Sequence, residues 1–178
     1  MEKDTIAELI ESKHLDYIKW VQNQPDDHWE KAPETKWSTG QHTLHLLQTL
    51  KAVNKALSMP KFLLRYKFGK SNRDVRDYDT VVKRYQERLK NVQGKTYKGS
   101  QNMKVPSIKN KVYLLSQMQQ EQKKLAYKTR KLSDKNLNNL ILPHPLMGKM
   151  PIRELLMWTS HHTEHHNNTL KDKYVFDS

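Results

Sequence analysis

Four histidines fall within six consecutive positions near the end of this chain, in the stretch TSHHTEHHNN at residues 159–168. The chain has nine histidines and no cysteine, so any metal site must use imidazole together with carboxylate or water ligands. Residues four apart on a helix lie about 5–6 Å apart at Cβ, which lets two imidazoles bind one ion through bonds of ~2.0–2.1 Å. The stretch therefore holds a workable half-site, in either of two pairs, His161/His165 or His162/His166.

Helical phase favours His162 and His166 as the pair that faces the protein interior. Their row continues through Leu155 and Leu170 at steps of three and four residues, as the buried stripe of a helix does. The other pair lies on a row that is otherwise polar. That row contains Glu154, Asn168 and Asp172. We therefore predict that His161 and His165 face solvent.

A catalytic metal site usually takes three protein ligands and leaves one position open for water or substrate. The candidates for the third ligand are the other five histidines, His14, His28, His42, His45 and His144. His45 is the best placed, because it lies two turns into a predicted helix and has leucines on both sides. A core histidine that is hydrogen-bonded to a neighbouring helix is the alternative, and spacing alone leaves both interpretations open.

The elements that must position these side chains are helical almost everywhere, since apolar residues recur at helical spacing and no alternating pattern continues for long. A first helix is predicted from the capping box Thr5-x-x-Glu8 to just before Pro25. A second capping box, Ser38-x-x-Gln41, begins a helix that ends before residue 60.

Three further helices are predicted in the rest of the chain. Residues 61–77 read as irregular with one short turn, and helices follow at about 79–92, 106–132 and 151–174. The stripe of the fourth helix consists of Ile108, Val112, Leu115, Met118, Gln122, Leu125 and Thr129. We predict one all-α domain over residues 1–178, a four-helix bundle with crossover connections and a basic insertion between the second and third helices.

Lysine and arginine outnumber aspartate and glutamate by 32 to 19, which gives a net charge of +13. Residues 61–104 contain thirteen basic and four acidic residues and so contribute +9 of that charge. This segment is either a binding surface for an anion or a solvated insertion. Four of its cations are candidates to hold an anionic ligand at the bundle mouth. These are Arg65, Lys67, Arg73 and Arg76. Three aromatic residues are expected to anchor the segment to the bundle. These are Phe62, Tyr66 and Phe68.

No apolar run approaches the ~20 residues of a membrane span, and the amino-terminal segment is acidic and amphipathic. We therefore expect a cytoplasmic protein with no membrane partner. Nucleic-acid binding is disfavoured, because only the positive charge favours it and the sequence contains no recognisable nucleic-acid-binding module. A homodimer is compatible with the sequence.

Three short motifs follow one another between residues 37 and 170. WSTGQHTLHL at residues 37–46 is similar to W-S-x-x-E-x-x-x-H-L, and HPLMGK at residues 144–149, with Glu154 and Leu156, to H-P-x-x-G-K-x-x-x-x-E-x-L. HTEHHNNTL at residues 162–170 is similar to H-x-x-[RH]-H-x-x-Q-[IL]. These motifs resemble the DinB/YfiT-like family, whose members are four-helix bundles with a central metal. Gln41 and Thr169 depart from its usual acidic residue and glutamine.

The resemblance implies a three-histidine centre of His45, His162 and His166 that holds a divalent transition metal, namely zinc, nickel, iron or manganese. It also implies a small-molecule substrate, anionic or thiol-containing. Known activities of the family are metal-dependent hydrolysis and transfer or isomerisation with a low-molecular-weight thiol such as bacillithiol or mycothiol. A non-catalytic metal-binding stress or storage protein is the alternative. Neither Glu154 nor Glu164 is aimed at the site, so we expect no internal carboxylate base.

Overall fold

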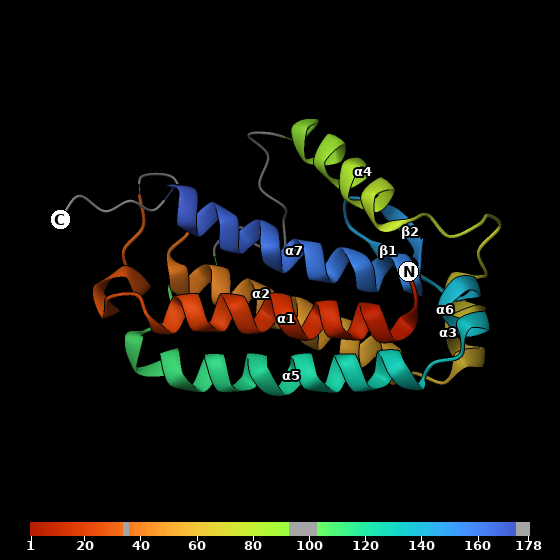
Figure 1. Ribbon diagram of the computed structural model, residues 1–178, viewed down its shortest axis with the longest axis horizontal. Helices are drawn as coiled ribbons and strands as arrows, with labels where there is room; N and C mark the ends of the chain where they lie inside the picture. Colours follow the sequence, from red (N-terminus) through yellow and green to blue (C-terminus); the bar gives the residue numbers. More distant parts are fainter. Residues whose placement is uncertain (34–35, 93–102, 174–178) are drawn as a thin grey trace.

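Four long helices lie side by side in the computed structural model, which describes residues 1–33, 36–92 and 103–173 (Figure 1). They are α1 (Lys3–Gln22), α2 (Thr39–Leu57), α5 (Lys111–Lys131) and α7 (Ile152–Lys173). Each of α1 and α2 packs against both α5 and α7, and the contact between α2 and α7 is the least extensive of the four. The prediction of an all-α protein is confirmed, apart from one small sheet.

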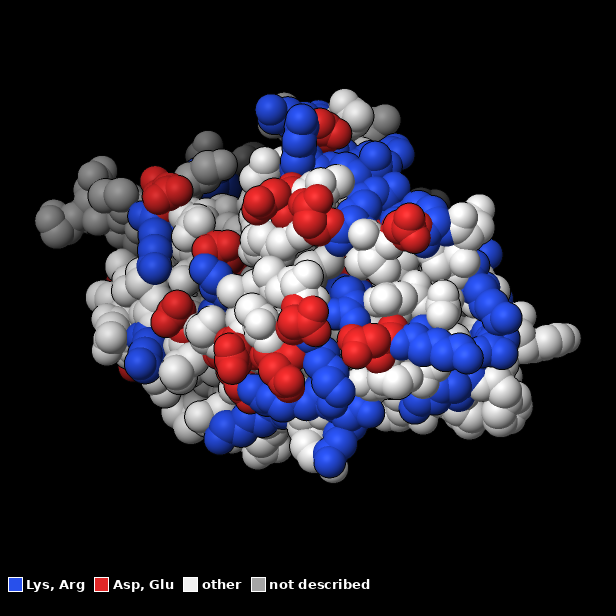
Figure 2. Space-filling view, turned by 45° about the vertical axis from the view of Figure 1, so that its right-hand side comes forward, with Lys and Arg blue, Asp and Glu red and all other residues white. Residues whose placement is uncertain are grey.

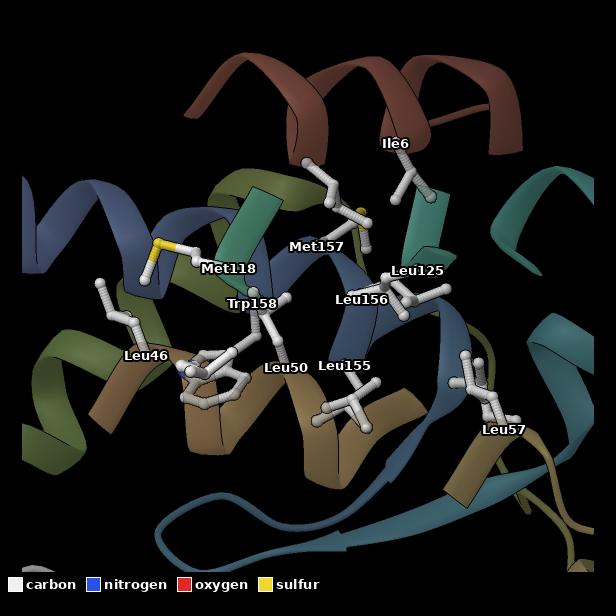
Figure 3. Close-up of a cluster of buried hydrophobic side chains, with 14 of the residues drawn as sticks. Ile6, Leu46, Leu50, Leu57, Met118, Leu125, Leu155, Leu156, Met157 and Trp158 are labelled. Carbon is white, nitrogen blue, oxygen red and sulfur yellow. The ribbon is translucent and has the colours of Figure 1, made fainter. Parts of the chain in front are cut away.

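The core between these helices is built from the apolar stripes that the sequence displays. Ile6 of α1, Leu50 of α2, Leu125 of α5 and Leu156 of α7 are each fully buried and meet in one cluster (Figure 3). Burial of such a side chain contributes about 1.5–3 kcal/mol relative to its exposed state. The cluster holds α2 and α7, which carry the histidines of interest, in a defined relative position.

Of the two predicted capping boxes, only the second exists. Ser38 Oγ accepts a hydrogen bond from the Gln41 backbone N–H, and Gln41 Oε1 accepts one from the Ser38 N–H. The first helix instead begins at Lys3 after Glu2, without a side-chain cap, and Thr5 lies inside its first turn. Gly40 follows the confirmed cap and lets Trp29 approach closely, since a Cβ there would lie 2.9 Å from the indole.

The fourth predicted helix begins later than expected. A single 3-10 turn, η2 (Ile108–Asn110), precedes α5, and this turn changes the phase between the two segments. Val112, predicted on the buried stripe, is 80% exposed, whereas Leu114 is buried. The remainder of the stripe, from Leu115 to Thr129, faces inward as predicted.

The segment between α2 and α5 contains more helix than the sequence indicates. Residues predicted to be irregular form the two-turn helix α3 (Lys61–Phe68), and α4 (Tyr78–Lys90) follows it. In Figure 1, α4 lies across α7, and the two helices are in contact. The short helix η1 (Asp26–Trp29) lies in the predicted loop after α1.

The connection before α7 contains the short helix α6 (Asp134–Asn139) and a two-stranded antiparallel sheet, where the sequence pattern predicts no strand. Strand β1 (Ile141–His144) pairs with β2 (Gly148–Pro151), with His144 opposite Gly148. Gly148 has a φ of +73°, a conformation that suits glycine. His144 Nδ1 accepts hydrogen bonds from the N–H groups of Leu146 and Met147, which closes the turn. Strands of four residues are too short for an alternating pattern to be recognised.

Among the described helices, none combines the length and apolar character that crossing a membrane requires.

His14 is a core histidine rather than a metal ligand. Its Nδ1 donates to the Ile10 carbonyl at 2.7 Å, so in the neutral ring Nε2 accepts from the Thr163 hydroxyl at 2.9 Å. Burial lowers the pKa of His14 to about 4. The ring therefore links α1 to α7 in its uncharged form.

We expect the free energy of unfolding to decrease as pH falls from about 6.5 to about 4, because unfolded His14 binds a proton that the folded ring excludes. The contribution should be present in full above pH 6.5, with a slope of up to roughly 1.4 kcal/mol per pH unit below it. Urea denaturation at several pH values, with a chelator present, measures this slope. Other buried histidines add to the total slope, so His14→Gln should reduce it by the His14 contribution alone, and an unchanged slope in that variant would contradict the assignment.

Candidate metal centre

The imidazoles of His45, His162 and His166 converge between α2 and α7. His162 Nε2 lies 3.2 Å from His45 Nε2 and 3.0 Å from His166 Nε2. One ring nitrogen from each of the three lies within 4.8 Å of the others, so the triad could hold a metal ion. A tetrahedral ion with bonds of ~2.0–2.1 Å separates its ligand nitrogens by about 3.3–3.4 Å. The observed spacings are close to that value.

The hydrogen bonding of His162 also fits a cation at this point. Its Nε2 faces two other ring nitrogens, yet a ring nitrogen carries either one proton or one lone pair and cannot form both contacts as ordinary hydrogen bonds. Its buried Nδ1 has no hydrogen-bond partner among the described residues. An imidazole that binds metal through Nε2 keeps its proton on Nδ1, and no described residue accepts that proton here.

Burial keeps the three imidazoles uncharged at neutral pH. It lowers the pKa of His45 to about 4. Burial, with repulsion from neighbouring histidines, also holds the pKa values of His162 and His166 well below 6.5. Neutral imidazole is the form that binds metal, so the ligands need not lose a proton first.

His42 approaches the triad from behind His166. Its Nδ1 lies 2.7 Å from His166 Nδ1, the ring nitrogen that faces away from the cluster. Burial lowers the pKa of His42 to about 3, so this contact joins two neutral rings. Such a contact fixes the tautomer and the orientation of a ligand histidine. The sequence indicates His42 only as a candidate ligand, because spacing does not show which ring nitrogens meet.

The structure keeps the other candidate histidines away from the three converging nitrogens. His14 is in the core, and His28 lies in η1 with Nε2 3.9 Å from an Asp27 oxygen. His144 closes the β-turn and packs edge-on against Trp158, with ring centroids 4.1 Å apart. The triad brought together by the fold is therefore the one that the family resemblance implies.

The prediction that the row of His161 faces solvent is wrong for the first half of α7. Side chains at residues 150–163 are all buried, including Glu154 at 1% exposure and His161 at 9%. The physical reason is that α4 and the residues before it cover this face, which helical phase does not reveal. Further along the helix, His165 is half-buried.

Glu154 is held by two arginines of the basic segment. Arg73 donates to both carboxylate oxygens at 2.5 and 2.8 Å, and Arg76 contributes its backbone N–H at 2.8 Å and a guanidinium contact at 3.3 Å. Burial alone would raise the pKa of Glu154, but these bonds and charges outweigh it and lower the pKa. Arg73 and Arg76 thus bind the protein itself, contrary to the expectation that they hold a ligand.

The remaining expectations for the basic segment are met only at Phe68. Arg65 and Lys67 are exposed on α3. Phe62 and Tyr66 are 75% and 89% exposed and so are not anchors, whereas Phe68 packs against the core. On the face in Figure 2, groups of lysines and arginines lie among acidic residues.

A cavity of about 980 Å³ adjoins the triad. Helices α2, α4 and α7 and the β1–β2 turn contribute most of its lining, and the least extensive helix contact, that between α2 and α7, lies along it. None of the described lining residues is acidic. Glu164 is instead paired with Lys13 and lies 3.7 Å from His161. The two glutamates of α7 considered from the sequence, Glu154 and Glu164, thus both lie in ion pairs outside this lining.

A mostly helical protein with a histidine triad that is buried at His162 and half-buried at His45 and His166, beside an open cavity, is thus the class that fold and site define. The DinB superfamily matches residues 11–170, nearly the whole chain, and the chain belongs to that superfamily. Comparison with curated proteins and with solved structures finds no significant match.

Arg73→Ala should destabilise the protein by roughly 3 kcal/mol, because it leaves the buried Glu154 carboxylate with one arginine instead of two. Urea denaturation measures the change. Lys31→Ala removes the exposed ion pair with Asp27 and should alter stability little. Equal stability of the two variants would contradict a structural role for the Arg73 contact.

Proposed function

We propose that the protein is a metal-dependent enzyme of the DinB four-helix-bundle type, with zinc, nickel, iron or manganese bound by His45, His162 and His166. The observation that carries the proposal is the convergence of three neutral Nε2 atoms on one point beside a large cavity. Three imidazole ligands leave a fourth position for water or substrate. The superfamily match adds support from an independent source.

The chemistry that such an ion supplies is a lowered pKa for water or a thiol in the open position. The side chains around the cavity favour a thiol. Water attack is usually assisted by a general base, and no described lining residue is acidic. A thiol has an ordinary pKa of about 8.5, close enough to neutral that deprotonation needs no such base. We therefore favour transfer involving a low-molecular-weight thiol over hydrolysis.

Two other lining residues can position a substrate. Burial raises the pKa of Tyr85, so its hydroxyl remains protonated and can donate a hydrogen bond but not act as a base. Burial lowers the pKa of His144 to about 4, and its Nδ1 accepts from two backbone N–H groups, so in the neutral ring Nε2 carries the proton. Both groups are hydrogen-bond donors at neutral pH.

The same lack of an acidic group supports a second candidate, a metal-binding protein without turnover. Metal binding is common to both candidates, and catalysis separates them.

Protein prepared without a histidine tag should contain close to one equivalent of a divalent transition metal per chain by elemental analysis. His45→Ala and His162→Ala should each lower this content at least tenfold, since each removes one of three ligands. His165→Ala, on the same helix but outside the triad, is the matched control and should retain the metal. Retention in the His45 variant would contradict the triad.

Cobalt-substituted protein should acquire a thiolate-to-cobalt charge-transfer absorption when a small thiol such as cysteine is added at neutral pH. The band is expected because a metal-bound thiol loses its proton. His162→Ala, exposed to cobalt under the same conditions, should not show it. If the parent protein shows no such band but cleaves ester substrates, hydrolysis replaces thiol transfer as the proposed reaction.

A further inference from the structure

The cavity beside the triad extends far beyond the space that a metal and a small thiol require. Its wall on α2 runs from His45 to Met59, just beyond the helix end, a span of about 20 Å at 1.5 Å per helical residue. Its volume of about 980 Å³ lies at the upper end of the range for small-molecule sites.

The chemistry of the lining changes along this length. Near the triad the cavity is bordered by Lys36, Trp37 and His42. The far part is apolar and comes from four separate segments. It is lined by Val53, Ala56, Met59, Phe68, Leu142 and Leu155. Lys36 is the one lysine or arginine among the described lining residues, and it lies at the triad end.

The apolar wall belongs to the packed body of the protein. Val53, Leu142 and Leu155 are buried core residues, and Met59 and Phe68 pack against that core while facing the cavity. A polar group placed there would lose its water without gaining a partner, whereas an apolar chain would gain from burial. The far part of the cavity therefore favours ligands with an apolar chain over polar ligands.

We propose that the substrate is an amphiphile. Its anionic or sulfur-containing head lies at the triad beside Lys36, and its unbranched apolar tail, on the order of ten carbons long, lies along α2 towards Met59 and Phe68. The placement of the head rests on the proposed function, while the tail site rests on the cavity alone.

Straight-chain alkyl hydroxamates of increasing length test the proposal by calorimetric titration of the metal-loaded protein, because the head binds metal and the tail probes the cavity. Affinity should rise up to about fourfold per methylene, the factor for complete burial of that group, and then level off when the cavity is filled. Affinity that is independent of length would overturn the proposal.

Ala56→Phe should fill the far part of the cavity, so that affinity levels off at a shorter chain while the shortest hydroxamates bind as to the parent protein. Ala52→Phe, at an exposed position on the same wall, is a second variant with less risk to folding. Lys55 is exposed on the same helix and lies outside the lining, so Lys55→Phe is the matched control. It should leave the dependence of hydroxamate affinity on chain length unchanged. A parent-like length dependence in both cavity variants would contradict the tail site.

Straight-chain alcohols, titrated into metal-free protein, separate this proposal from the metal centre. If alcohol affinity rises with chain length but added metal does not raise the affinity for hydroxamates, the tail site stands and the metal-dependent function fails. If hydroxamates bind only the metal-loaded protein and length has no effect, the metal centre stands and the tail site is overturned.

Discussion

The burial of α7 on every side over its first half is the constraint on which the site depends. The four-helix core encloses one side of the helix, and α4 with its preceding residues encloses the other. Imidazoles in such surroundings lose the hydration that stabilises their charged form, so they remain neutral with free lone pairs. Burial alone would leave those lone pairs unsatisfied. Three Nε2 atoms that meet in this way could share one cation as a common partner.

The tightly packed interface and the cavity lie on two sides of the same set of helices. On the side of α1, the long helices interdigitate tightly through residues such as Ile6 and Leu156, which excludes solvent (Figure 3). Between α2 and α7 the contact is less extensive, and the space is left to the cavity. Stability thus comes chiefly from one interface of α7, while the cavity lies along another and shares with the core only wall residues such as Val53 and Leu155.

Much of this could be predicted from sequence, and the failures have two physical causes. Helical phase grouped His162 with His166, and the motif around His45 supplied the third histidine, because both depend on local spacing. Helical phase shows which residues share a face of a helix but not which element covers that face. The burial of Glu154 and its ion pairs therefore could not be predicted. The hairpin escaped for a different reason, since four-residue strands leave too little pattern to recognise.

The ion pairs of Glu154 have a consequence for the cooperativity of unfolding. If the residues around Arg73 and Arg76 opened alone, the carboxylate would lose its counter-charges while the rest of α7 stayed folded. A charge stranded in this way is costly, so independent fraying of that segment is suppressed. Although it resembles a surface insertion in sequence, the segment around Arg73 and Arg76 behaves as part of the same folding unit as the bundle.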